Sequence, residues 1–180
     1  MRVVETAIPD VRIVDPRVFA DDRGAFFESW NARAFSQLGI DATFVQDNHS
    51  RSRRNVLRGL HYQIRHGQGK LVRVVSGEVY DVVVDLRASS PTFGRHEGVT
   101  LSETNRRMLW VPPGFAHGFL VLSAHADFVY KTTDYWYPEH ERTLLWNDPA
   151  LRIAWPLEGM PTIAPKDAAG TPLAQAERYA

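Results

Sequence analysis

The chain has 180 residues, a length typical of one domain with a single hydrophobic core, here spanning residues 1–180. Its 21 basic and 21 acidic residues give no overall positive field, so nucleic acid is not an expected partner. The absence of cysteine excludes disulfides, thiolate metal sites and cysteine nucleophiles. Apolar runs such as Val82–Val84 are strand-sized, and Met1–Asp10 lacks the apolar core of a signal peptide, so we expect a cytoplasmic protein with no membrane span.

Short stretches in which apolar and polar residues alternate predict β-strands along much of the chain. In chain order these stretches are Val11–Val14, Phe26–Trp30, Phe44–Asp47, Leu57–Gln63, Leu71–Val75, Val79–Leu86 and Met108–Val111. Turn-forming residues punctuate them at Asp21–Gly24, Ser76–Gly77, Ser89–Pro91 and Pro112–Gly114. Little room is left for crossover helices, so we predict an all-β antiparallel sandwich or barrel.

Helical signals appear only at the edges of this pattern. Asn31 is a suitable N-cap for a short helix through Ala32–Leu38, and the stretch after Pro165 predicts another. Arginines gather in Arg51–Arg54, followed by Arg58, and could serve an anionic ligand. A solvated turn is the favoured interpretation of Arg51, Arg53 and Arg54.

Three segments combine unusual polar residues with a strand context: Gln46–Asn48 leading to Leu57–Gln63, then Pro112–Phe119, then Phe128–Asp134. Further short motifs occur in register at Asp22–Gly24 with Glu28, Gly69–Lys70, Val84–Arg87, Trp146–Pro149 and Lys166–Asp167. In order and approximate spacing, from about Ile8 to Asp167, these segments resemble the dTDP-4-dehydrorhamnose 3,5-epimerase family. A single motif would be weak evidence, but this many in register are specific.

The resemblance implies a fold, a partner and a reaction. The fold would be a cupin-type antiparallel β-sandwich, or jelly roll, with short peripheral helices, and the protein would be a homodimer. The enzyme would need neither a metal ion nor an organic cofactor. It would invert C3 and C5 of dTDP-4-dehydro-6-deoxy-D-glucose, giving dTDP-4-dehydro-β-L-rhamnose, a step in dTDP-L-rhamnose biosynthesis for surface polysaccharides such as O-antigen.

This chemistry needs a base, an acid on the opposite face of the ring and stabilisation of an enolate. The C4 ketone acidifies the neighbouring carbons, but not enough for any side-chain base to act alone. The resemblance assigns the base to His61 with Asp167 as its partner, the proton donor to Tyr130 and the active-site lysine to Lys70. An ammonium group against the C4 oxygen would stabilise the developing negative charge.

Other residues are assigned to substrate binding. The resemblance gives substrate contacts to Arg23, Glu28, Gln46, Asp47, Asn48, Arg58, Glu141 and Lys166. His117 matches a further substrate contact, and Asp81 could hold its ring by a hydrogen bond. Trp136 stands where many members carry a tyrosine that stacks on the thymine, and an indole offers the same flat face.

The strand that contains Arg58 and His61 presents a difficulty. Strict alternation sends residues three apart to opposite faces of a sheet, so the two side chains should not share a pocket. A bulge at Gly59 could rotate Arg58 inward. Alternatively, the two residues could serve different walls of a site that a partner subunit completes.

Seven of the candidates also have an ordinary structural explanation. The alternatives are a satisfied core histidine for His61, a loop histidine for His117, a core-capping phenol for Tyr130, an exposed edge lysine for Lys70, a buried hydrogen-bond acceptor for Asp81, a helix cap for Asp167 and buried packing for Trp136.

Three other functions compete with 3,5-epimerisation. A metal-dependent cupin would gather several histidines, but this strand offers His61-Tyr62-Gln63 in place of a His-x-His pair, and His49 and His66 are expected in loops. An epimerase acting at C3 alone, or a ketoisomerase of the same sugar nucleotide, would share most of the pocket. A non-catalytic binding module would have no need of a paired base and acid.

Overall fold

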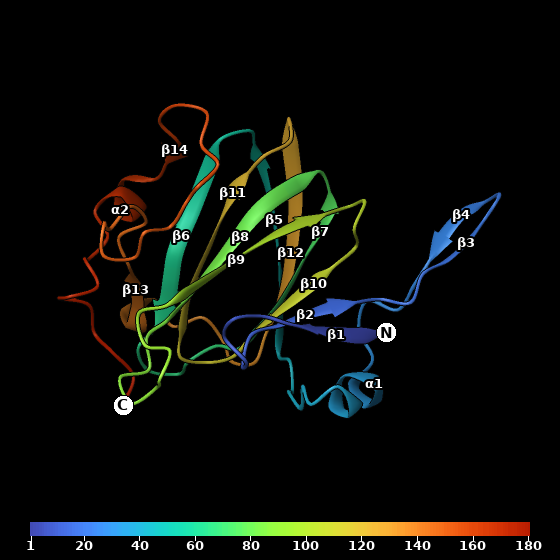
Figure 1. The fold of residues 1–180 in the computed structure, drawn as a ribbon, viewed down its shortest axis with the longest axis horizontal. Helices are drawn as coiled ribbons and strands as arrows, with labels where there is room; N and C mark the ends of the chain where they lie inside the picture. Colours follow the sequence, from blue (N-terminus) through green and yellow to red (C-terminus); the bar gives the residue numbers. More distant parts are fainter.

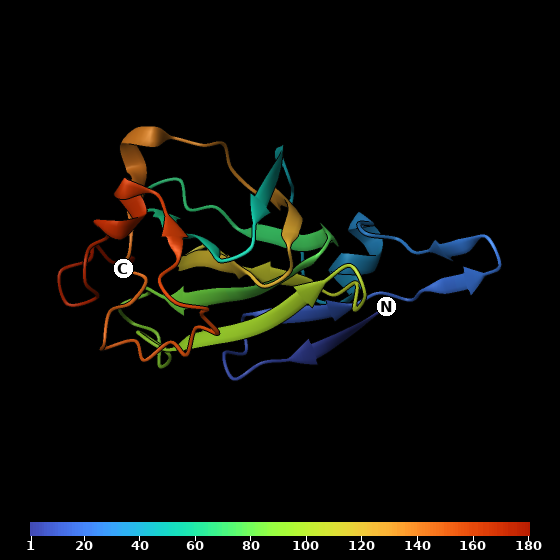
Figure 2. The same cartoon turned by 90° about the horizontal axis from the view of Figure 1, so that it is seen from above.

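The computed structural model describes residues 1–180, which form two antiparallel sheets packed face to face (Figures 1 and 2). The first sheet has the strand order β1 (Arg2–Glu5), β2 (Arg12–Asp15), β10 (Met108–Val111), β7 (Lys70–Ser76), β12 (His125–Thr132), β5 (Gln46–Arg53). The second has the order β13 (Glu141–Thr143), β6 (Val56–Gln63), β11 (Phe115–Val121), β8 (Glu78–Asp85), β9 (His96–Ser102). A short strand, β14 (Thr162–Ile163), adds to β6 in parallel. The predicted all-β, cupin-type sandwich is confirmed.

The remaining elements are short and peripheral. They are the hairpin of β3 (Phe19–Asp21) and β4 (Gly24–Phe26), the helices α1 (Ala32–Gln37) and α2 (Pro165–Ala168), and the 3-10 turn η1 (Pro138–His140). Asn31 caps α1 as predicted, because its side chain accepts a hydrogen bond from the Ala34 amide. No helix has the length and apolar character required to cross a bilayer.

Apolar side chains from both sheets fill most of the space between them. Val72, Val74 and Phe128 of the first sheet meet Val83 and Phe119 of the second, and all five are at most 5% exposed. Each such burial stabilises the fold by roughly 1.5–3 kcal/mol. The alternation that predicted the strands therefore also selects the face of each strand that points inward.

The outer faces of the sheets are covered by different segments. The helix α1 covers part of the first sheet, where Phe35 packs with Leu71 and Met108. The chain that follows β13 crosses the outer face of the second sheet, and its Leu151 is buried in the cluster that contains Tyr62. The two cartoon views show these coverings on opposite sides of the sandwich (Figures 1 and 2).

Three of the local predictions need correction. The predicted strand Phe26–Trp30 ends at Phe26, because Trp30 turns inward and its ring packs 4.6 Å from Phe35. The segment Arg51–Arg53 is strand rather than turn: it continues β5, with the arginines on the exposed face and Ser52 facing inward. Since β5 extends to Arg53, His49 also lies on a strand and not in a loop.

The β3–β4 hairpin projects away from the sandwich, at the right of Figures 1 and 2. Its two phenylalanines, Phe19 and Phe26, are 52% and 69% exposed. Both side chains belong to one projecting element and leave large apolar surface open to solvent.

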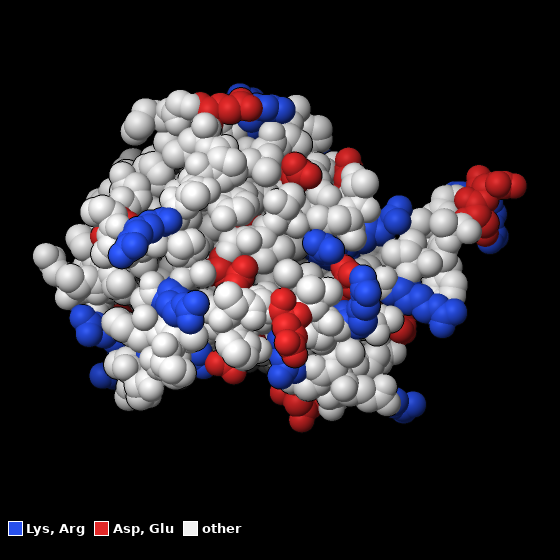
Figure 3. Space-filling view, viewed as in Figure 1, with Lys and Arg blue, Asp and Glu red and all other residues white.

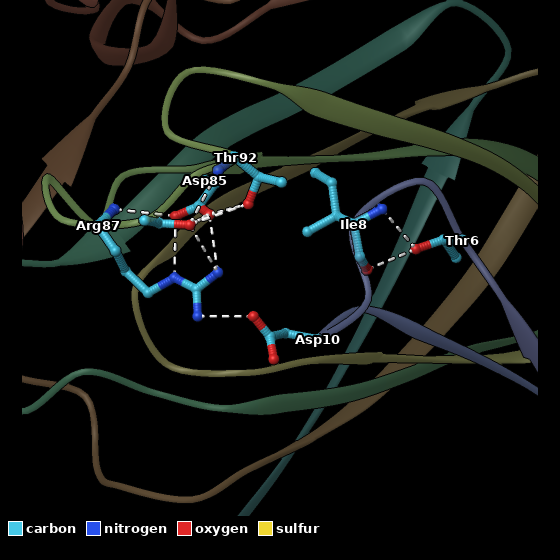
Figure 4. Close-up of polar contacts among 7 residues, drawn as sticks. Thr6, Ile8, Asp10, Asp85, Arg87 and Thr92 are labelled. Carbon is cyan, nitrogen blue, oxygen red and sulfur yellow. Dashed lines mark hydrogen bonds and ion pairs between the residues drawn. The ribbon is translucent and has the colours of Figure 1, made fainter.

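A buried carboxylate ties the N-terminal segment to the end of β8 (Figure 4). Arg87 donates to both oxygens of Asp85, at 2.9 and 2.7 Å, and pairs with Asp10 at 2.9 Å. Burial acts to raise the pKa of Asp85, but hydrogen bonds from Arg87, Thr92 and Ser90 outweigh it and lower the pKa to about 2. The Arg87 guanidinium also lies over the ring of Phe115, at the start of β11. This network fixes the strand that carries His117.

Candidate active site

A pocket of about 360 Å³ opens between the two sheets, at the end where their facing side chains become polar. The first sheet contributes Gln46, Asn48, Ser50, Lys70 and Tyr130 to its walls. The second sheet contributes Arg58, His61, Gln63, His117 and Glu141. Trp136 and Lys166 lie at its margin on connecting segments. Ten of the fifteen predicted site residues therefore line one cavity.

A β-bulge brings Arg58 and His61 into this same pocket. In the pairing of β6 with β11, His61 lies opposite His117 while Arg58 lies opposite Phe119, so two residues of β6 oppose one of β11. The extra residue reverses the alternation of side chains along β6, so Arg58 and His61 point to the same face. This is the bulge at Gly59, one of the two expected alternatives. Gly59 permits it: with φ of 120°, a Cβ there would lie 2.6 Å from the Cα of Gly118.

His61 is paired with a buried carboxylate from a distant part of the chain. Its Nε2 lies 2.7 Å from Oδ1 of Asp167, whose Oδ2 accepts the Gly59 amide at 3.1 Å. Burial acts to raise the pKa of Asp167, but the His61 and Gly59 hydrogen bonds outweigh it and hold the pKa below its ordinary value. An ionised Asp167 accepts only, so Nε2 carries the proton and Nδ1 is left free as a base.

A second histidine–aspartate pair lies deeper in the pocket. Nε2 of His117 is 3.0 Å from both oxygens of Asp81, which is fully buried. Burial raises the pKa of Asp81, against the lowering effect of His117 and Lys70. Asp81 does not line the pocket, so it orients the ring of His117 as the sequence predicted.

Lys70 is a buried cation with little protein compensation. Lys70 is 8% exposed, and its Nζ makes one long hydrogen bond, 3.5 Å to the carbonyl of His61. Burial lowers the pKa of Lys70 to about 8, although Asp81 and Glu141 act to raise it. The alternative of an exposed edge lysine is wrong, because β7 is an interior strand of its sheet. The ammonium is available to an anionic group in the pocket.

Tyr130 stands on the wall opposite His61. It belongs to β12 of the first sheet, whereas His61 belongs to β6 of the second. Burial, together with the charge of Glu141, raises the pKa of Tyr130 above its ordinary value, against the effect of Arg58. The phenol therefore stays protonated at neutral pH and can donate a proton into the pocket.

The polar margin of the pocket is suited to an anionic, partly aromatic ligand. Arg58 is held by a hydrogen bond from its Nε to the Ser52 hydroxyl, at 2.9 Å. Lys166 pairs with Glu141 at 3.2 Å. Gln46 and Asn48 bond each other at 3.0 Å on the opposite wall. Trp136 is 57% exposed, which contradicts its interpretation as buried packing.

Three predicted substrate contacts lie outside this pocket. Arg23 and Glu28 are on the projecting hairpin and the segment after it, and the Arg23 guanidinium binds Asp21. Asp47 points to the outer face of β5, where it pairs with Lys131 at 2.9 Å, because alternation sends it away from Gln46 and Asn48. Within a single chain, none of the three reaches the cavity.

The interpretation of Asp167 as an exposed helix cap is also wrong. The N-cap position of α2 is Ala164, and Asp167 is 2% exposed. The polar side chains of the pocket wall that sequence reasoning missed are Gln63, Ser50 and Gln68. The period-two spacing from His61 to Gln63, and from Asn48 to Ser50, was the signal that could have found the first two.

The pocket does not have the donors of a metal centre. No three histidine, cysteine, aspartate or glutamate side chains lie close enough together to hold a metal ion. On the face in Figure 3, basic and acidic side chains are interspersed and form no extended patch of one sign.

A cupin-like sandwich with an imidazole and a phenol on opposite walls of one pocket defines an isomerase of the acid–base type. The family model described as dTDP-4-dehydrorhamnose 3,5-epimerase matches residues 5–175. The chain belongs to this family.

Individual relatives are similar over nearly the whole chain. The dTDP-4-dehydrorhamnose 3,5-epimerase of Pseudomonas aeruginosa is 60% identical over 180 residues, covering 99% of each chain. A crystal structure of the Legionella pneumophila 3,5-epimerase, in complex with dTDP-4-keto-L-rhamnose, has a TM-score of 0.94 at 52% identity and covers 97% of this chain and 93% of its own. A 3'-monoepimerase of Streptomyces bikiniensis has a TM-score of 0.90 at 33% identity, covering 98% of this chain and 89% of its own.

Proposed function

We propose that this chain is a dTDP-4-dehydrorhamnose 3,5-epimerase that converts dTDP-4-dehydro-6-deoxy-α-D-glucose to dTDP-4-dehydro-β-L-rhamnose. The observation that carries this proposal is the placement of His61, with its Asp167 partner, opposite Tyr130 across one pocket. Membership of the family and the similarity of the relatives support the choice of substrate.

The reaction follows from two proton transfers on opposite faces of the sugar. His61 removes the proton from the carbon beside the C4 ketone, and the electron pair of that bond moves to the C4 oxygen as an enolate. Tyr130 then donates its proton to the same carbon from the other face, which inverts the centre. The protonated His61 then gives its proton to solvent water, and the Tyr130 phenolate takes a proton from solvent. Both groups are then ready to repeat the cycle at the second carbon.

Lys70 and His117 would act on the enolate rather than on the carbon. A buried ammonium near the C4 oxygen gains most when negative charge develops there, because the pocket screens it less than water would. His117, held by Asp81, presents its ring to the same cavity. These roles account for a buried Lys70 that has no strong protein partner.

The role of Lys70 predicts an alkaline limit to activity. Because the pKa of Lys70 is lowered to about 8, the enzyme should lose its charged enolate stabiliser, and turnover should fall, as pH rises above about 8. Stability should move the other way. The pKa of Lys70 in the folded protein lies below its unfolded value of 10.5. The free energy of unfolding should therefore rise with pH between about 8 and 10.5, and this gain in stability is lost as pH falls through about 8.

This prediction is checked by kcat from about pH 6.5 to 10, with urea unfolding at the same pH values. In Lys70→Arg, any remaining turnover should lack the alkaline limb, because a guanidinium keeps its proton over this range. Wild-type turnover that stays level to pH 9.5 would contradict the assignment.

The nucleotide half of the substrate would occupy the margin of the pocket. Arg58 and Lys166 supply positive charge for the diphosphate, and the exposed face of Trp136 suits stacking on the thymine. Gln46 and Asn48 offer amide groups on the facing wall.

A homodimer would bring two of the three remaining predicted contacts into use. The projecting hairpin presents exposed Phe19 and Phe26 beside Arg23, and Glu28 follows it. We infer that this hairpin docks on a partner subunit and delivers Arg23 and Glu28 to the margin of the partner's pocket. Light scattering should show a dimer, and a fully active monomer would overturn this arrangement. The cytoplasmic location and the single domain over residues 1–180 stay predictions.

The test of the proposed function is proton NMR of chelator-treated protein with dTDP-4-dehydro-6-deoxy-D-glucose in deuterium oxide. Deuterium should enter both C3 and C5, and a rhamnose-forming reductase should accept the product. Exchange at C3 alone would assign the chain to mono-epimerisation, the activity named for the Streptomyces bikiniensis relative. Exchange that requires added metal would instead favour a metal-dependent cupin.

A further inference from the structure

Gln63 connects the strand that carries His61 to the segment that carries Trp136. It is the last residue of β6, two positions after His61, and is 3% exposed. Its Oε1 accepts the amide of Tyr137 at 2.7 Å. Its Nε2 donates to the carbonyl of Tyr135 at 3.1 Å and to that of His66 at 2.7 Å.

The orientation of this carboxamide is determined by its three partners. One backbone N–H faces the oxygen and two carbonyls face the nitrogen, so reversing the amide would break all three hydrogen bonds at once. Two of the three are made to the residues directly before and after Trp136. Gln63 therefore fixes the backbone on both sides of that residue.

Trp136 itself has little else to hold it in place. Its side chain forms no ring pair with another aromatic residue of the chain, and it is 57% exposed. Its own backbone amide makes only a long hydrogen bond, 3.4 Å to Oε1 of Gln46. The position of the indole at the pocket margin thus depends on the neighbouring backbone.

Gln63 is itself rigidly supported. The Tyr179 hydroxyl donates a hydrogen bond to the Gln63 carbonyl. In the pairing of β13 with β6, Glu141 lies opposite Gln63. A second carboxamide, that of Gln68, reaches the same segment but makes a single bond, 2.9 Å to the Asp134 carbonyl, one residue further from Trp136. The chain thereby offers a matched comparison between two glutamines that hold one segment.

We propose that Gln63 is a positioning residue that presets Trp136 for the nucleobase and thereby sets the affinity for the nucleotide half of the substrate. This inference rests on the proposed function, since it takes a thymidine nucleotide as the ligand. A preset indole binds without the cost of ordering its segment, so the role belongs to binding and not to proton transfer.

The first measurement is the Kd of dTDP by calorimetry for Gln63→Met, which keeps the length of the side chain but removes its hydrogen bonds. The Kd should rise about ten-fold, the effect of roughly 1.4 kcal/mol in binding. At saturating substrate, kcat should change less than about three-fold. Gln68→Met should raise the Kd by a smaller factor than Gln63→Met.

A double-mutant cycle with Trp136→Ala separates positioning from a general structural role. If Gln63 acts through Trp136, adding Gln63→Met to Trp136→Ala should leave the Kd unchanged within about two-fold. A full ten-fold loss in that background, or a fall in kcat as large as the rise in Kd, would overturn the positioning role. Failure of the unaltered protein to bind dTDP would instead overturn the proposed function, and this inference with it.

Discussion

Replacing His61 by alanine should lower the rate of deuterium exchange at the sugar carbons by about 10²–10⁴-fold, the usual contribution of a positioned general base. Nδ1 of His61 is the free nitrogen of an imidazole whose other nitrogen is held by Asp167 at 2.7 Å. Without it, the wall opposite Tyr130 loses the imidazole that Asp167 holds and that is assigned as the base. Binding of dTDP should persist, because the predicted nucleotide contacts lie at the margin of the pocket.

The experiment follows deuterium incorporation by NMR and dTDP binding by calorimetry on the same preparation. His61→Ala leaves the buried Asp167 carboxylate with one partner fewer, so stability also has to be followed by circular dichroism. His61→Gln is the matched variant: its amide can still donate to Asp167 but is not a base. Turnover retained in His61→Gln would remove His61 from the base role.

Replacing Tyr130 by phenylalanine should separate exchange from inversion. The base on the opposite wall survives, so the carbon still loses its proton, and His61 can return a deuteron to the same face. Inversion should fall by about 10²–10⁴-fold while exchange with retention continues. The raised pKa of Tyr130 supports a donor that is fully protonated when the substrate binds.

This outcome is read as the ratio of deuterated starting sugar to epimerised product in deuterium oxide. Tyr130 has no hydrogen bond to another side chain, so its phenylalanine variant should keep its fold. Inversion at the normal rate would contradict the assignment of Tyr130 as the donor. Loss of both exchange and inversion would place Tyr130 in enolate formation rather than in reprotonation.

Several site residues could be predicted because their motifs lie within continuous strands. The alternation in Leu57–Gln63 and Met108–Val111 identified strands that the structure contains. The same local pattern failed at Phe26–Trp30, because Trp30 finds a better burial against Phe35 than a continued strand would give it. Local alternation reports which side chains are apolar but not which neighbour will cover them.

The sequence by itself determined the class of fold and most of the residues at the site. It could not decide whether Arg58 and His61 share a wall, because that depends on a bulge between β6 and β11 and on the close approach of Gly59 to Gly118. It also could not show that Gln63 bonds Tyr135, 72 residues away, and so holds the segment around Trp136. These features are contacts between distant segments, and their geometry is set by how the two sheets pack, which no local pattern encodes.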